Sequence, residues 1–152
     1  MARVLSTKER LALPRLPMPA RPAVERVCDF DEVATGYGEL TAIAEAERCL
    51  QCKKPECVAG CPVGIDIPAF VAAVADGRFA EALSLIKRDN TLPAICGRVC
   101  PQEDQCEAVC VTGNKGDPVA IGRLERFVAD RELKQGTLTM PRRAESSGYK
   151  VG

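Results

Sequence analysis

Apolar residues recur every three or four positions in several stretches of the chain, which is the spacing that places side chains on one face of an α-helix. The last stretch shows the pattern clearly, with Ile121, Leu124 and Val128 on one face and Phe127 alongside. We therefore predict amphipathic helices in these stretches. They cover residues 39–50, 79–88 and 119–134.

Residues typical of helix ends predict one more helix. Asp66 can cap its first turn, Pro68 suits a first helical position, and Gly77 is the kind of residue that ends a helix. Further on, Pro93 interrupts the helical pattern, so we expect a loop over residues 95–101. Together these elements predict an all-α fold, a small helical bundle.

The N-terminal segment differs from the rest of the chain. Three prolines between residues 14 and 19 forbid a helix there. We expect an extended arm that lies on a partner or on its own domain; a partly disordered terminus is the alternative. The predicted organisation is a Pro-rich arm over 1–38, a helical domain over 39–136 and a tail over 137–152.

Composition changes the picture of the core. The chain has 152 residues, the length of one ordinary domain, and 46% of them are hydrophobic. It contains no Trp, four Phe and two Tyr, so large side chains that could fill a core are scarce. Bound metal clusters could therefore serve as part of the core.

Charge excludes several functions. With 21 basic and 21 acidic residues the net charge is zero, so no global attraction to nucleic acid or to an anionic membrane is expected. The absence of His removes the commonest general base and any Cys/His zinc finger.

No signal peptide or membrane-spanning stretch is visible. We expect a cytoplasmic protein, in which clustered cysteines more often bind metal than form disulfides.

Nine cysteines provide the candidate chemistry. Thiolates are soft ligands that suit iron–sulfur clusters or zinc. Bacterial ferredoxins have three close cysteines followed by a Cys-Pro pair, but here the second gap is four residues rather than two. Zinc sites usually have two close pairs, and only one two-residue gap is present. Spacing favours iron–sulfur clusters and leaves zinc open. The grouped residues are Cys49, Cys52, Cys57, Cys61, Cys96, Cys100, Cys106 and Cys110.

Two residues outside these groups need an interpretation. Cys28 stands alone and is expected to be a small buried hydrophobic residue. Glu125 falls at the edge of the apolar face of the last predicted helix. A carboxylate at that position needs a partner or a metal if it is buried, whereas an exposed one can extend into water. The residues alone favour the exposed interpretation.

Five motifs occur between residues 17 and 135. They are RCLQC at 48–52, GCPVGIDIP at 60–68, GRVCP at 97–101, CEAVC at 106–110 and PVAIGRLERF at 118–127. Together they resemble the N-terminal iron–sulfur domain of the glutamate synthase small chain, which also occurs in dihydropyrimidine dehydrogenase. The motif sequences are most similar to the large subunit of NADH-dependent reduced ferredoxin:NADP oxidoreductase, also called sulfide dehydrogenase alpha subunit.

The resemblance implies a helical domain around two [4Fe–4S] clusters with crossed ligation. Seven thiolates and one carboxylate would serve as ligands, and Cys96 would lie outside both clusters. Glu125 occupies the position of the family's non-cysteine ligand, which reverses the interpretation from its helical position. One implied set is Cys49, Cys52, Cys57 and Cys110; the other is Cys61, Cys100, Cys106 and Glu125.

The resemblance also implies a function. The domain would relay single electrons between a flavin and another redox centre in a cytoplasmic oxidoreductase complex, with electron bifurcation as the expected chemistry. No G-x-G-x-x-G motif is present, so FAD and NAD(P) are expected on a partner subunit or a missing domain, and ferredoxin is a further candidate partner. The alternatives are an iron–sulfur fragment of a glutamate synthase small chain and a structural metal-binding module that docks subunits.

Overall fold

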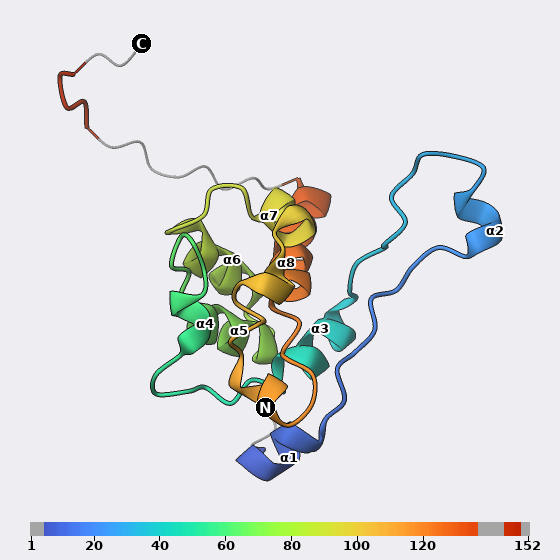
Figure 1. Cartoon of the computed structure of the whole chain (residues 1–152). Helices are drawn as coiled ribbons and strands as arrows, with labels where there is room; N and C mark the ends of the chain where they lie inside the picture. Colours follow the sequence, from blue (N-terminus) through green and yellow to red (C-terminus); the bar gives the residue numbers. More distant parts are fainter. Residues whose placement is uncertain (1–4, 137–144, 150–152) are drawn as a thin grey trace.

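Helices are the main secondary structure in the part of the chain that the structure describes. The computed structural model describes residues 5–136 and 145–149, so most of the predicted tail lies outside the described residues. No strand occurs in these ranges, and the predicted all-α class is confirmed (Figure 1). The helices are α1 (Thr7–Ala12), α2 (Ala23–Arg26), α3 (Glu39–Ala46), α4 (Glu56–Ala59), α5 (Ile67–Ala75), α6 (Phe79–Lys87), α7 (Pro93–Val99) and α8 (Ile121–Gln135), with 3₁₀ turns η1 (Gln102–Asp104) and η2 (Val111–Asn114).

The core lies between α5, α6, α8 and α3. The largest fully buried apolar side chains include Phe70, Ile86 and Leu124. Phe79 and Phe127 join α6 to α8 through an edge-to-face contact, with ring centroids 5.0 Å apart. The periodic patterns thus predicted α6 and α8 correctly, because their apolar faces meet in this core. No helix among the described residues is long and apolar enough to cross a membrane.

The predicted ends of α5 are also confirmed. The Asp66 side chain accepts a hydrogen bond from the Ala69 backbone N–H at 3.2 Å, and Pro68 lies in the first turn. Gly77 then adopts φ = +72°, which reverses the chain into α6. The predicted end of α3 is different in the structure. This helix ends at Ala46 rather than continuing to Leu50, so Cys49 lies beyond it.

The prediction of a loop over residues 95–101 is wrong. Pro93 begins α7 instead of ending a helix, because a proline in the first turn loses no intrahelical hydrogen bond. Gly97 lies inside α7, where a Cβ atom would come within 2.6 Å of the Arg126 backbone nitrogen in α8. The glycine that suggested a loop is therefore required by the close approach of two helices.

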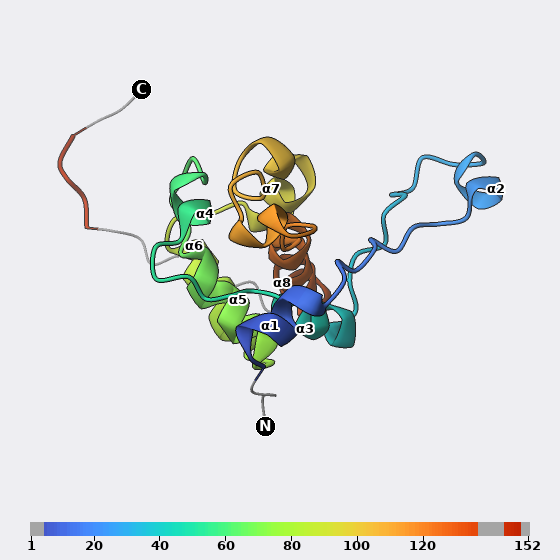
Figure 2. The same ribbon diagram turned by 60° about the horizontal axis from the view of Figure 1, so that its bottom comes forward.

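The N-terminal arm contacts its own domain. It begins with α1, whose N-terminus is a capping box between Ser6 and Glu9. The chain then runs extended along the helical body and continues into a long excursion that carries α2 away from that body in both views (Figures 1 and 2). An isolated bridge between Ala20 and Ala34 pairs the outgoing and returning segments of the excursion.

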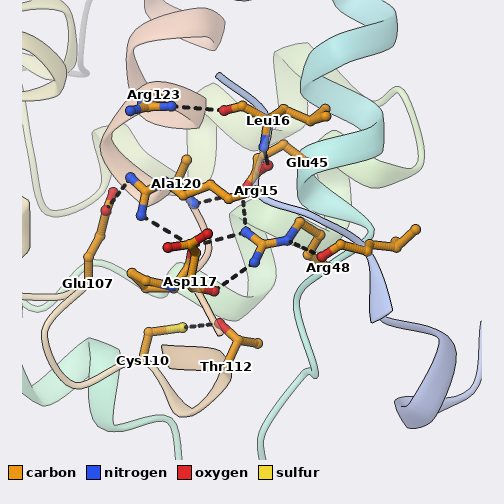
Figure 3. Close-up of polar contacts among 12 residues, drawn as sticks. Arg15, Leu16, Glu45, Arg48, Glu107, Cys110, Thr112, Asp117, Ala120 and Arg123 are labelled. Atoms are coloured by element: carbon orange, nitrogen blue, oxygen red, sulfur yellow. Dashed lines mark hydrogen bonds and ion pairs between the residues drawn. The ribbon is translucent and has the colours of Figure 1, made fainter. Parts of the chain in front are cut away.

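A buried ion pair fixes the arm to the helices (Figure 3). Glu45 of α3 and Arg48 are both almost inaccessible to water, and their side chains are 2.6 Å apart. The Glu45 carboxylate also accepts hydrogen bonds from the backbone N–H groups of Leu16, at 2.8 Å, and Ala120, at 2.9 Å.

The guanidinium of Arg48 completes the same network. It donates to the backbone carbonyls of Leu13 at 3.1 Å, Asp117 at 2.6 Å and Pro118 at 2.9 Å. The pair therefore connects three segments, the arm, the end of α3 and the segment that leads into α8. Because buried charges are tolerated only when fully paired, the network specifies how these segments meet.

Removing one member of this pair is expected to destabilise the protein strongly. Glu45→Ala leaves the Arg48 charge and two backbone N–H groups buried without their acceptor, a loss of about 3–5 kcal/mol. The melting temperature should fall on the order of 10 °C for a chain of this size. Circular dichroism at 222 nm during heating measures the change.

A matched control removes an exposed ion pair. Glu81→Ala breaks the pair with Arg78 on the surface of α6, and pairs exposed to water contribute little. Equal melting temperatures for the two variants would contradict the role assigned to Glu45.

Candidate metal centre

Four thiols from three separate segments line one small pocket beside the core. Cys49 and Cys52 follow α3, Cys57 lies in α4, and Cys110 immediately precedes η2. The rest of the lining is mostly apolar and includes Val119. The structure thus brings together the four cysteines of the first implied set, although Cys57 and Cys110 are 53 positions apart in the sequence.

The electrostatics of this pocket oppose free thiolates. Burial raises the pKa of the Cys49 thiol to about 11 and that of Cys57 to about 12. Nearby Cys110 and Cys52 contribute to the raised pKa of both thiols, while a backbone hydrogen bond from Gln51 opposes the rise at Cys49. A bound cationic group reverses this balance, because metal coordination deprotonates a thiol outright. The pocket is therefore suited to thiolates that are neutralised by a metal.

Hydrogen bonds hold the loop that carries Cys49. Arg10 donates to the carbonyls of Glu47, at 2.6 Å, and Cys49, at 3.1 Å. Gln51 adopts φ = +52° and donates through Nε2 to the Cys49 sulfur at 3.3 Å and to the Pro68 carbonyl at 3.1 Å. These contacts fix the direction of the first thiol relative to α5.

The segment that carries Cys110 is held between the arm and α8 (Figure 3). Glu107 is buried, pairs with Arg15 at 2.6 Å and accepts a hydrogen bond from the Gly122 N–H at 3.3 Å. The Cys110 sulfur lies 3.1 Å from the Thr112 hydroxyl. The position of this thiol therefore depends on contacts with the arm.

A second group of donors lies where α7 meets α8. Cys100 directly follows α7, and Cys61 directly follows the end of α4. Burial raises the pKa of Cys100 to about 11, and smaller contributions come from nearby Cys96, Glu125 and Cys61. The pKa of Cys106 rises to about 12, mainly through burial and then through Glu107 and Cys61. Cys61 therefore interacts electrostatically with both Cys100 and Cys106, and Glu125 interacts with Cys100, which indicates that these four side chains belong to one region of the fold.

Glu125 is buried rather than extended into water, contrary to the interpretation from its helical position alone. Its exposed fraction is 7%, and Oε1 accepts a hydrogen bond of 2.7 Å from Asn90 Nδ2. Burial raises the pKa of Glu125 to about 7, and the Asn90 hydrogen bond opposes that rise. A buried carboxylate thus interacts electrostatically with Cys100, and the ligand role that the resemblance implies for Glu125 stays a prediction.

The two remaining cysteines differ from each other. Cys28 is exposed near α2, so the prediction of a small buried residue is wrong. Cys96 is half-buried and adjoins the second group. Among the residues described by the structure, no three Cys, Asp or Glu side chains converge as they would around a single metal ion.

Sequence reasoning missed the side chains that support these donors. Arg10 and Asn90 lie outside the motifs quoted above, and Gln51 lies within RCLQC but is not among the predicted site residues. Each acts through contacts that only the folded chain creates, such as the hydrogen bond of Asn90 to Glu125, which lies 35 positions away in the sequence.

Comparison with known proteins supports an iron–sulfur assignment. Residues 26–137 match the family described as dihydropyrimidine dehydrogenase domain II, 4Fe-4S cluster. The chain is 37% identical to the glutamate synthase [NADPH] small chain of Escherichia coli K12 over 91% of its own length and 29% of the relative. For the corresponding small chain of Azospirillum brasilense the identity is 36%, over 87% of this chain and 28% of the relative.

A third relative has a different activity in its name. The Escherichia coli K12 NAD-dependent dihydropyrimidine dehydrogenase subunit PreT is 39% identical over 70% of this chain and 26% of its own length. The chain therefore spans less than a third of the length of these relatives. The match over residues 26–137 shows that this chain belongs to the family of [4Fe–4S] domains typified by domain II of dihydropyrimidine dehydrogenase.

Proposed function

We propose that the chain holds two [4Fe–4S] clusters and relays single electrons between a flavin and another redox centre. The observation that carries this proposal is the separation of the donors into two groups of four. In the first group the thiols line one pocket, and in the second Cys100 interacts electrostatically with the buried carboxylate of Glu125 and with Cys61. The proposed ligand sets are Cys49, Cys52, Cys57 and Cys110, and Cys61, Cys100, Cys106 and Glu125.

The donor types fit these clusters. Thiolates are the usual ligands of [4Fe–4S] clusters, which supply reversible one-electron chemistry when bound. The chain's own contribution is to fix the donors, exclude water with apolar walls such as Val119, and set the local charge. Glu125 makes the two donor sets unequal, because a carboxylate is a harder ligand than a thiolate.

The partner is proposed from the relatives. Their names describe oxidoreductases that use NADPH or NAD, and this chain covers only 25–29% of the glutamate synthase small chains and of PreT. We therefore assign the flavin and NAD(P) sites to further sequence or to a partner subunit. Ferredoxin as a terminal partner and electron bifurcation belong to the same proposal.

Metal and sulfide analysis tests the proposal directly. Anaerobically purified protein should contain about eight iron atoms and eight acid-labile sulfides per chain, and dithionite should produce EPR signals of reduced clusters. Zinc without sulfide would instead identify a structural module, and the relay would be ruled out.

The close contact of α7 with α8 should be needed by the second cluster alone. Gly97→Ala forces the helices apart, because the new Cβ would lie 2.6 Å from the Arg126 nitrogen. Iron and sulfide should fall to about four each per chain, while the first cluster keeps its EPR signal. Gly116→Ala is the control, since a Cβ atom at that position would point into open space, with no packed neighbour within 4 Å. Full cluster content in Gly97→Ala would contradict this placement.

The carboxylate should give the two clusters different potentials. Glu125→Cys replaces the one non-thiol donor and is expected to shift one midpoint potential while the other stays constant. An EPR-monitored redox titration measures both, with the exposed Glu103→Gln as control. Two unchanged potentials would show that Glu125 is not the source of the asymmetry.

A further inference from the structure

Asn90 lies between Glu125 and Cys96, two side chains that could each complete the second donor group. The inference drawn from this contact rests on the proposed function above. The Asn90 Nδ2 donates to Glu125 Oε1 at 2.7 Å, and its Oδ1 lies 3.6 Å from the Cys96 sulfur, which donates to it. Cys96 in turn adjoins Cys100, one of the proposed ligands. One buried amide thus contacts both the carboxylate donor and a thiol that belongs to neither set.

The backbone fixes the orientation of this amide. The Asn90 N–H donates to the Ile86 carbonyl at 2.9 Å, which holds the residue at the end of α6. The Leu92 N–H donates to Oδ1 at 2.9 Å. Because a backbone N–H can only donate, the amide oxygen must face Leu92, and the NH₂ group must face Glu125. Reversing the amide would remove both contacts.

This orientation has opposite effects on the two potential ligands. The NH₂ group favours an ionised carboxylate and directs it, which suits a metal ligand. The amide oxygen accepts from Cys96 and therefore requires its sulfur to keep the proton. Only a thiolate binds metal strongly, so the same contact opposes ligation by Cys96. Without it, the softer sulfur would be the better donor for iron.

We propose that Asn90 selects Glu125 over Cys96 as the fourth ligand of the second cluster. When Asn90 is replaced by an apolar residue, ligation passes to Cys96. The iron–oxygen bond to Glu125 breaks, an iron–sulfur bond to Cys96 forms, and the thiol proton moves to the released carboxylate. The number of irons and the charge of the assembly are unchanged by this exchange.

Three variants test the selection in the full chain. Asn90→Leu preserves the approximate shape but neither donates nor accepts through its side chain. Glu125→Ala removes the carboxylate ligand directly. Both should keep about eight irons and should show the same new EPR signal and midpoint potential for the second cluster, since both leave four thiolates there. Adding Cys96→Ser to Glu125→Ala should abolish that signal and lower the iron content to about four, since no fourth ligand remains. Adding it to Asn90→Leu should also abolish the new signal but keep about eight irons, because Glu125 is again the available donor.

Controls separate this inference from the proposed function. Cys96→Ser alone should match the wild type, because Cys96 is not a ligand when Asn90 is present. The EPR signal of the first cluster reports an intact fold in every variant. If Asn90→Leu loses that signal, Asn90→Ser is used in its place, because a serine hydroxyl can accept the hydrogen bond from the Leu92 N–H. An unchanged second-cluster signal in the Asn90 variant, or a new signal that survives Cys96→Ser, overturns the selection. Wild-type protein without about eight irons and sulfides overturns the proposed function instead.

Discussion

The buried pair of Glu45 and Arg48 is the interaction on which the rest of the arrangement depends. Neither charge can remain buried alone, and together they require acceptors and donors from the arm, α3 and the segment before α8. Arg48 immediately precedes Cys49, and its guanidinium binds the carbonyl of Asp117, seven residues after Cys110. The pair therefore connects the two ends of the first thiol group. A network that forms only when three distant segments meet also makes an alternative arrangement of those segments costly.

The thiols extend a core that is poor in large side chains. Cys106 is part of the buried apolar cluster, and Cys49, Cys57, Cys61 and Cys110 pack against it. The same burial raises the pKa of Cys49, Cys57 and Cys106 to between about 11 and 12. Metal binding would neutralise these groups where the fold has already removed water, so that cluster binding would be coupled to folding. Under the proposed function, the clusters would then contribute to a core that contains no Trp.

The sequence predicted the features that depend on local spacing. The ends of α5 and the apolar faces of α6 and α8 follow from neighbouring residues, and the structure reproduces them. Prediction from the sequence failed where one residue type is compatible with two local structures. Pro93 can end one helix or begin the next, and Gly97 can mark a loop or a close helix contact. Cys28 is exposed although most lone cysteines are buried. Side chains such as Asn90 could not be identified, because their partners are brought near only by folding.

The two donor groups are held by different physical means, and this difference bears on how the domain can tune them separately. The first group belongs to loops that the Glu45–Arg48 network and Arg10 position through backbone carbonyls. The second belongs to the contact of α7 with α8, where Gly97 permits the approach and Asn90 orients the carboxylate. Under the proposed function, unequal ligation of the two centres would allow each step of the relay to have its own potential.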